Sequence, residues 1–160
     1  MESNDKLEQE SDRSAFLIVG ALLETNLEKL ILAKLKEGTS LRHIGANNFA
    51  AKIDLSFALG LIEDGRKNLY HSFRKIRNNF AHSAEFLSFE NVDIKAMFES
   101  DPKLGKAFDD AIENVLSKQE GMPDSFSFEQ FWTPRKKFNI LFQAEVAHLQ
   151  SVIEQVNRIE

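Results

Sequence analysis

The sequence contains no cysteine, and among its 160 residues only three are proline and seven are glycine. The lack of cysteine excludes a disulfide framework, Cys-ligated zinc, iron–sulfur clusters and a thiol nucleophile. The scarcity of helix-breaking residues favours long helices. With 20 basic and 25 acidic side chains the net charge is −5, which excludes a generally basic nucleic-acid coat protein.

Long hydrophobic runs are also missing. The longest stretch without a polar side chain, from Ala15 to Leu23, has nine residues, whereas a bilayer span needs about 20. Acidic residues precede this stretch, the opposite of a signal peptide. We therefore expect a cytoplasmic protein without membrane contact.

Several chemical signatures are absent as well. No phosphate-binding or dinucleotide-binding glycine loop, no H-E-x-x-H and no G-x-S-x-G occurs. The four histidines, at positions 43, 71, 82 and 148, form no short metal-ligand pair. We expect neither a metal nor a cofactor.

Apolar residues are abundant, at 42%, and include 14 Phe against one Tyr and one Trp. Phe fills a core without needing a hydrogen-bond partner. The apolar periodicity predicts one all-α domain over residues 11–160, a bundle of five to six helices, after an acidic disordered tail at 1–10. The helices are expected at about 11–36, 49–61, 63–82, 92–99, from 102, and from 134 to the end. The aromatic segment 126–132 is interpreted as a loop held on the core, or as an interface patch.

The first helix is apolar in almost every direction, which predicts a central position in the bundle. Glu24 shares an angular sector with apolar side chains and therefore needs a partner. Arg77, at the boundary of the apolar stripe of the third helix, needs a carboxylate partner, for which Glu24 is the first choice and Asp54 the second. A Glu24–Arg77 pair could be purely structural.

The third helix also concentrates positive charge, because 65–82 holds five basic residues and no acid: Arg66, Lys67, Arg74, Lys75 and Arg77. They are candidates for phosphate binding, or they form a solvated face whose positive charge is balanced by nearby acidic residues. A second basic cluster, Arg135, Lys136 and Lys137, opposes the dipole at the start of the last helix. That unfavourable placement suggests contact with an anion.

Three stretches together suggest a family: Ser14 to Glu24, Phe57 to Ile62, and Arg74 to His82. In them the chain resembles the mannitol operon repressor family of bacterial regulators, over about residues 13–89. The resemblance implies an all-helical transcriptional repressor that acts through protein or nucleic-acid contacts, without a standard DNA-binding motif.

Arg77, Asn78 and His82 also resemble the catalytic signature of the HEPN superfamily of small helical ribonucleases. That resemblance implies His82 as the acid–base group, Arg77 on the scissile phosphate and Asn78 orienting it. The two interpretations, a non-enzymatic regulator and a metal-independent ribonuclease or RNA-binding domain, stay open at this point. In either case the many Phe residues predict surplus apolar surface and a homodimer.

Overall fold

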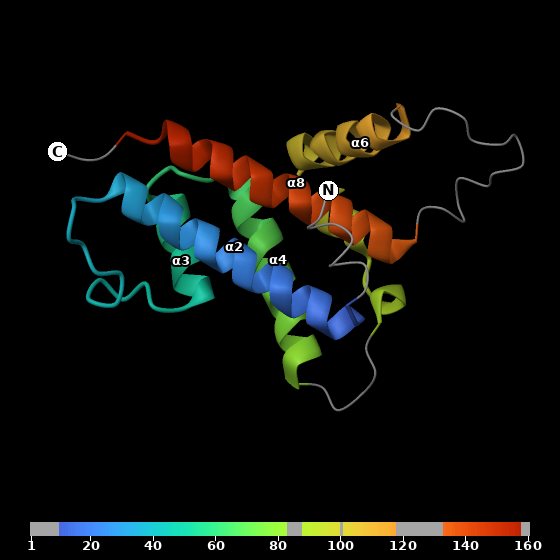
Figure 1. Cartoon of the computed structure of the whole chain (residues 1–160), viewed down its shortest axis with the longest axis horizontal. Coiled ribbons are helices and arrows are strands. Elements are labelled where there is room, and N and C mark those ends of the chain that lie inside the picture. The colour runs from blue at the N-terminus through green and yellow to red at the C-terminus, as the bar shows by residue number, and fades with distance from the viewer. Residues whose placement is uncertain (1–9, 83–87, 100, 118–132, 158–160) are drawn as a thin grey trace, which may run out of the picture.

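The computed structural model of the chain describes residues 10–82, 88–99, 101–117 and 133–157 (Figure 1). These residues form six α-helices, one short 3-10 turn and no β-strand, which confirms the predicted all-α bundle. The elements are α2 (Asp12–Lys34), α3 (Phe49–Ala58), α4 (Asp64–His82), η1 (Phe89–Asn91), α5 (Ile94–Glu99), α6 (Pro102–Ser117) and α8 (Pro134–Gln155). The acidic tail up to residue 9 and the aromatic segment 126–132 lie outside the described residues.

Polar side chains begin the helices where the sequence predicts it. Asn48 accepts a hydrogen bond from the backbone N–H of Ala51 at 3.0 Å, and Thr133 accepts one from Lys136 at 3.3 Å. Asp101 accepts two, from Lys103 and Leu104. Each of these bonds satisfies a backbone donor that the first turn of a helix leaves free.

Helix α3 ends three residues before the expected position. Gly60 has φ +67°, a left-handed conformation that glycine adopts readily. The N–H of Gly60 then bonds the carbonyl of Phe57, and the N–H of Leu61 bonds that of Ser56, each at 2.9 Å. This pair of bonds closes the helix and turns the chain toward α4.

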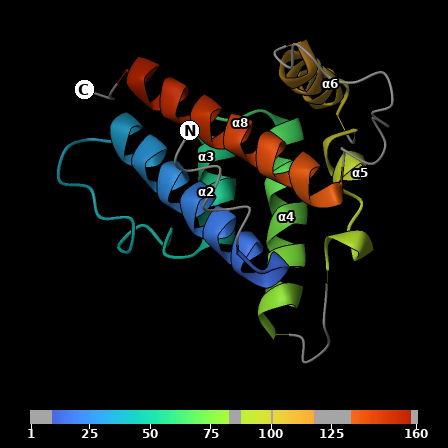
Figure 2. The same ribbon diagram turned by 45° about the vertical axis from the view of Figure 1, so that its right-hand side comes forward.

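Helix α2 lies at the centre, in contact with α8, α3 and α4. Figures 1 and 2 show α2 and α8 side by side, running in the same direction, with α4 crossing behind them. The guanidinium of Arg13 donates to the carbonyl of Ala81, so the start of α2 lies beside the end of α4. Helices α3 and α4 form an antiparallel hairpin.

Phenylalanine rings fill the space between α2, α4 and α8. Phe16 is fully buried, with its ring centroid 4.3 Å from that of Phe80 and 4.5 Å from that of Phe138. Phe73 and Phe142 continue the cluster at 4.7 Å. Each such aromatic pair contributes about 0.5–1.5 kcal/mol beyond the burial of its area.

The apolar pattern of α2 predicts a helix surrounded by others. Helices α3, α4 and α8 contact it, but its outer face is exposed. Leu17, Ile18 and Leu22 are 39%, 39% and 44% exposed. No other described helix covers this outer face, although its residues are as apolar as those that point inward.

Candidate nucleic-acid interface

Helix α4 separates its buried stripe from a polar stripe. Leu69, Tyr70, Phe73 and Phe80 are buried. The opposite side carries, at spacings of four, three and four residues, His71, Lys75, Asn78 and His82. Lys75 and His82 are exposed, and His71 and Asn78 are half-buried. Such spacing places the four side chains along one face of the helix.

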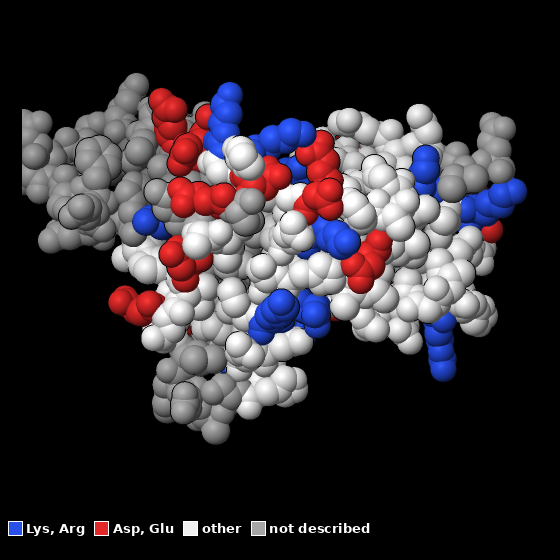
Figure 3. Space-filling model, turned by 180° about the vertical axis from the view of Figure 1, so that it is seen from behind, with Lys and Arg blue, Asp and Glu red and all other residues white. Residues whose placement is uncertain are grey.

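Figure 3 views the molecule from behind, where α3 and α4 face the reader. Lys and Arg atoms appear on this side in separate groups, interspersed with acidic ones. The surface is therefore mixed in sign, and the positive charge predicted along α4 does not form one continuous patch.

The side chain of His71 contacts a carboxylate on the neighbouring helix α3. Its Nε2 lies 3.0 Å from Oδ1 of Asp54, across the α3–α4 hairpin. Asp54, the second choice of partner for Arg77, is therefore bound to His71.

Among the basic candidates on α4, Lys75 is exposed and can meet an external anion. Arg74 is half-buried, and its Nε is buried without a hydrogen-bond partner. Lys67 instead lies with Nζ 4.3 Å from the centre of the Phe57 ring, a cation–π contact.

Arg77 lies along the boundary of the bundle, with its side chain 24% exposed. Its Nη2 lies 4.0 Å from Oε2 of Glu24, and its guanidinium carbon lies 5.5 Å from the centre of the Phe49 ring. The side chain crosses Gly20, where a Cβ would come within 3.2 Å of its Nε. Arg77 thus occupies the boundary position expected from the sequence, beside the expected carboxylate.

The three residues of the ribonuclease-like signature do not converge. On an ideal helix Arg77 and His82 are separated by about 140°, and only Asn78 and His82 share a face. Within the described chain, no hydrogen bond or ion pair joins any two of them. A shared phosphate site would need Arg77 to leave its contacts with Gly20 and Phe49.

The nearest partner of Glu24 is Lys52, which the sequence analysis missed. Lys52 Nζ lies 3.0 Å from Glu24 Oε1 and 2.8 Å from Glu28 Oε2, and the Lys52 side chain is 9% exposed. Burial by itself would lower the pKa of Lys52, but the hydrogen bonds and charges of Glu28 and Glu24 outweigh it and raise the pKa. One signal was available: Lys52 adjoins Ile53 and follows Phe49 by three positions, on the inward side of its helix.

Arg66 is bound to an internal carboxylate. Its Nε and Nη2 donate to the two oxygens of Glu145 at 3.1 and 3.3 Å, and the Tyr70 hydroxyl donates to the same carboxylate at 2.8 Å. Tyr70 is fully buried and Glu145 is 5% exposed. Burial, and then the charge of Glu145, raises the pKa of Tyr70 well above its usual value. The signal for Glu145 is its place between Phe142 and Leu149 on the buried stripe of the last helix.

An open pocket of about 240 Å³ adjoins this group at the α3–α4 turn. Its lining residues include Gly60, Glu63, Arg66 and His148. Burial and the neighbouring charge of Arg66 lower the pKa of His148. The pocket therefore holds a guanidinium already paired with Glu145 and an imidazole that resists protonation.

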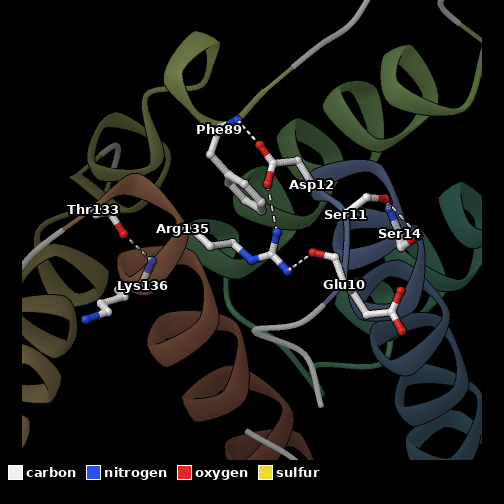
Figure 4. Close-up of polar contacts among 8 residues, drawn as sticks. All are labelled: Glu10, Ser11, Asp12, Ser14, Phe89, Thr133, Arg135 and Lys136. Carbon is white, nitrogen blue, oxygen red and sulfur yellow. Dashed lines mark hydrogen bonds and ion pairs between the residues drawn. The ribbon is translucent and has the colours of Figure 1, made fainter. Parts of the chain in front are cut away.

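The second basic cluster is tied to the start of α2 (Figure 4). Arg135 Nη1 lies 2.8 Å from Asp12 Oδ1, and Nη2 donates to the carbonyl of Glu10 at 2.9 Å. Its guanidinium carbon also lies 4.9 Å from the centre of the Phe89 ring. These contacts within the chain offset the positive charge of Arg135 at the start of α8. Lys136 and Lys137 are half-buried there.

Comparison of the chain with protein-family models, with curated proteins and with solved structures finds no match. In the part of the chain that the structure describes, no helix is both long and apolar enough to cross a membrane. The described residues likewise contain no group of three or more His, Asp or Glu arranged to hold a metal ion.

Proposed function

We propose that this chain is a cytoplasmic regulatory domain of the mannitol operon repressor type, which acts as a homodimer by binding and not by chemistry. Its contact surface for nucleic-acid phosphates is the polar face of α4, defined by His71, Arg74, Lys75, Asn78 and His82. One observation carries the proposal: α4 exposes Lys75 and His82, with His71, Arg74 and Asn78 half-buried beside them, while the cation of the ribonuclease-like signature, Arg77, packs at the boundary of the bundle against Gly20 and Phe49.

The chemistry of this face suits phosphate contact. Arg74 and Lys75 supply positive charge, and the amide of Asn78 can donate to a phosphate oxygen. Side chains of these types fix a protein on a nucleic-acid backbone without reading its sequence. Binding through so few charges is weak and falls with rising salt.

The test is a titration of labelled duplex DNA and labelled RNA at low and moderate salt. The variant combines Arg74→Gln with Lys75→Gln, and the matched control removes one exposed positive charge on α6, Lys106→Gln. Wild type and control should bind with a log–log salt slope of about two in magnitude, and the double variant should lose most of that slope. The proposal is wrong if wild type does not bind at low salt, or if wild type, the double variant and the control bind with equal affinity.

A metal-independent, HEPN-like ribonuclease is the second candidate, favoured by Asn78 and His82 one turn apart on the outer face of α4. His82 would serve as the acid–base group once Arg77 swings outward to hold the phosphate. Incubation with labelled RNA decides this, with His82→Ala beside the exposed loop histidine variant His43→Ala. Cleavage lost only in His82→Ala supports the ribonuclease. No cleavage by wild type leaves the binding function.

A further inference from the structure

The residues on the outer face of α2 follow a pattern of residue types that reads similarly from either end of the helix. Its side chains are exposed or half-buried and recur about once per turn: Ser14, Leu17 with Ile18, Ala21 with Leu22, Thr25, and Lys29. Glu10, which is also exposed, lies in the segment just before the helix. Figures 1 and 2 show α2 crossing in front of α3 and α4, with no described helix in front of it. The apolar centre of this face, Leu17, Ile18, Ala21 and Leu22, is thus flanked by a small hydroxyl residue and then a charge at each end.

We propose that this face binds the same face of a second copy of the chain, with the two α2 helices antiparallel about a two-fold axis between positions 19 and 20. In that register Leu17 lies opposite the partner's Leu22. Ile18 lies opposite the partner's Ala21, so a large side chain meets a small one. Because the axis repeats each contact, one helix supplies both halves of the interface.

The charges at the ends of the face select this arrangement. The same axis places Ser14 opposite the partner's Thr25, and it brings Glu10, two residues before the first residue of α2, toward the partner's Lys29. A parallel pair of helices would instead bring Glu10 to the partner's Glu10 and Lys29 to the partner's Lys29. Like charges in contact are unfavourable, whereas the antiparallel register gives two pairs of opposite charge.

Glu10 is free to make this contact. Its backbone carbonyl accepts from Arg135, and Figure 4 shows its carboxylate pointing away from that guanidinium. No ion pair or hydrogen bond within the described chain involves the side chain of Lys29.

The contact is small. Three large apolar side chains per copy fall short of the roughly 800 Å² per partner of a standard interface. The dimer should therefore be weak, with a dissociation constant on the order of micromolar.

The experiment is sedimentation equilibrium of the full chain, without nucleic acid, from low micromolar to several hundred micromolar protein. Wild type should pass from monomer to dimer. Ile18→Glu should weaken the dimer at least tenfold while circular dichroism and melting temperature stay near wild type, because the residue lies on the surface. Lys106→Gln, which lowers the net charge by the same single unit at an exposed position of α6, should leave the dimer unchanged.

A charge exchange tests the register. At low salt Lys29→Glu should weaken the dimer severalfold, because it faces the partner's Glu10. Adding Glu10→Lys should restore the wild-type dissociation constant. A monomer at every concentration, or a dimer with the same dissociation constant in wild type and Ile18→Glu, would overturn the interface. If the charge exchange did not restore the dissociation constant, the antiparallel register would be wrong. The interface rests on the homodimer of the proposed function, which a monomer at every concentration would also overturn. None of these results bears on the phosphate contacts of α4, which are tested separately.

Discussion

Asp12 and Arg135 are 123 positions apart in the chain, yet Oδ1 of one lies 2.8 Å from Nη1 of the other. The pair joins the first turns of α2 and α8. Asp12 also accepts from the backbone N–H of Phe89 through its second oxygen, at 2.9 Å. A single carboxylate therefore holds three separate segments together, and its charge offsets an arginine that opposes the dipole of its own helix.

Arg135→Gln should lower the free energy of unfolding by about 1–3 kcal/mol, because Asp12 loses its charged partner in a partly buried place. The matched control is Lys137→Gln, two residues along the same helix. It removes a cation from the first turn and should change stability by only a few tenths of a kcal/mol, toward greater stability. Urea unfolding followed by circular dichroism measures both. Equal effects of the two substitutions would contradict a specific role for the Asp12–Arg135 pair.

Lys52→Met should cost on the order of 2 kcal/mol, because it leaves Glu24 and Glu28 close together without their shared cation. Glu24→Ala should cost less, since Lys52 keeps Glu28 at 2.8 Å and Arg77 lies 4.0 Å from Glu24. Thermal unfolding of the two variants gives the order. If Glu24→Ala proved the more damaging, Arg77 and not Lys52 would be the main partner of Glu24.

Gly20 and Arg77 should be energetically coupled. Alanine at position 20 gains about 1 kcal/mol of helix propensity over glycine. Its Cβ, however, would lie 3.2 Å from Nε and 3.3 Å from Cγ of Arg77, whose guanidinium also packs on the Phe49 ring. We expect Gly20→Ala to destabilise the wild type and to stabilise an Arg77→Ala background.

A double-mutant cycle measured by urea unfolding tests that coupling. The expected interaction free energy is at least about 1 kcal/mol, since the sign of the Gly20→Ala effect changes between backgrounds. Additive effects would show that Arg77 moves aside freely, which would also make the outward swing required of a ribonuclease easier.

The helices could be predicted from local signals, because capping side chains and apolar spacing act within a few residues. Asp101–Pro102 and Thr133–Pro134 begin helices as expected, and the spacing of Leu69, Phe73 and Phe80 fixed the buried side of α4. The angular position of Glu24 likewise predicted a partly buried carboxylate near Arg77.

The partners of charged side chains could not be predicted as well. Arg66 and Arg135 were expected to face solvent or an external anion, and Lys52 was not singled out, since long basic side chains are mostly exposed. Each is paired with an acid from another helix, and such pairing depends on how helices distant in sequence are placed. The exposed side of α2 escaped prediction for the same reason, because an apolar side chain does not reveal whether a neighbour covers it.

His148 should make stability sensitive to mild acid. Its pKa in the folded chain is lowered by burial and by Arg66, so the unfolded chain binds its proton first as the pH falls. Stability is therefore full above the ordinary histidine pKa of 6.5 and declines as the pH drops below it. In His148→Gln this part of the decline should vanish, whereas His43→Gln, in an exposed loop, should behave as wild type. Melting temperatures between pH 5 and pH 7.5, about one unit or more on either side of that pKa, provide the comparison.

Tyr70 should limit stability at the alkaline end. Its pKa in the folded chain lies well above the ordinary tyrosine value of 10.0, because burial and the adjacent Glu145 carboxylate disfavour the phenolate. The unfolded chain releases this proton first, so the stabilisation is present below pH 10 and is lost as the pH rises above it. Tyr70 is the one tyrosine of the chain, and the near-ultraviolet absorbance of phenolate therefore reports on this residue alone. We expect that absorbance to appear only together with the loss of helical circular dichroism, and Tyr70→Phe to unfold at a higher pH than wild type. A phenolate signal that develops while the helices remain intact would place the hydroxyl in contact with water and contradict its burial against Glu145.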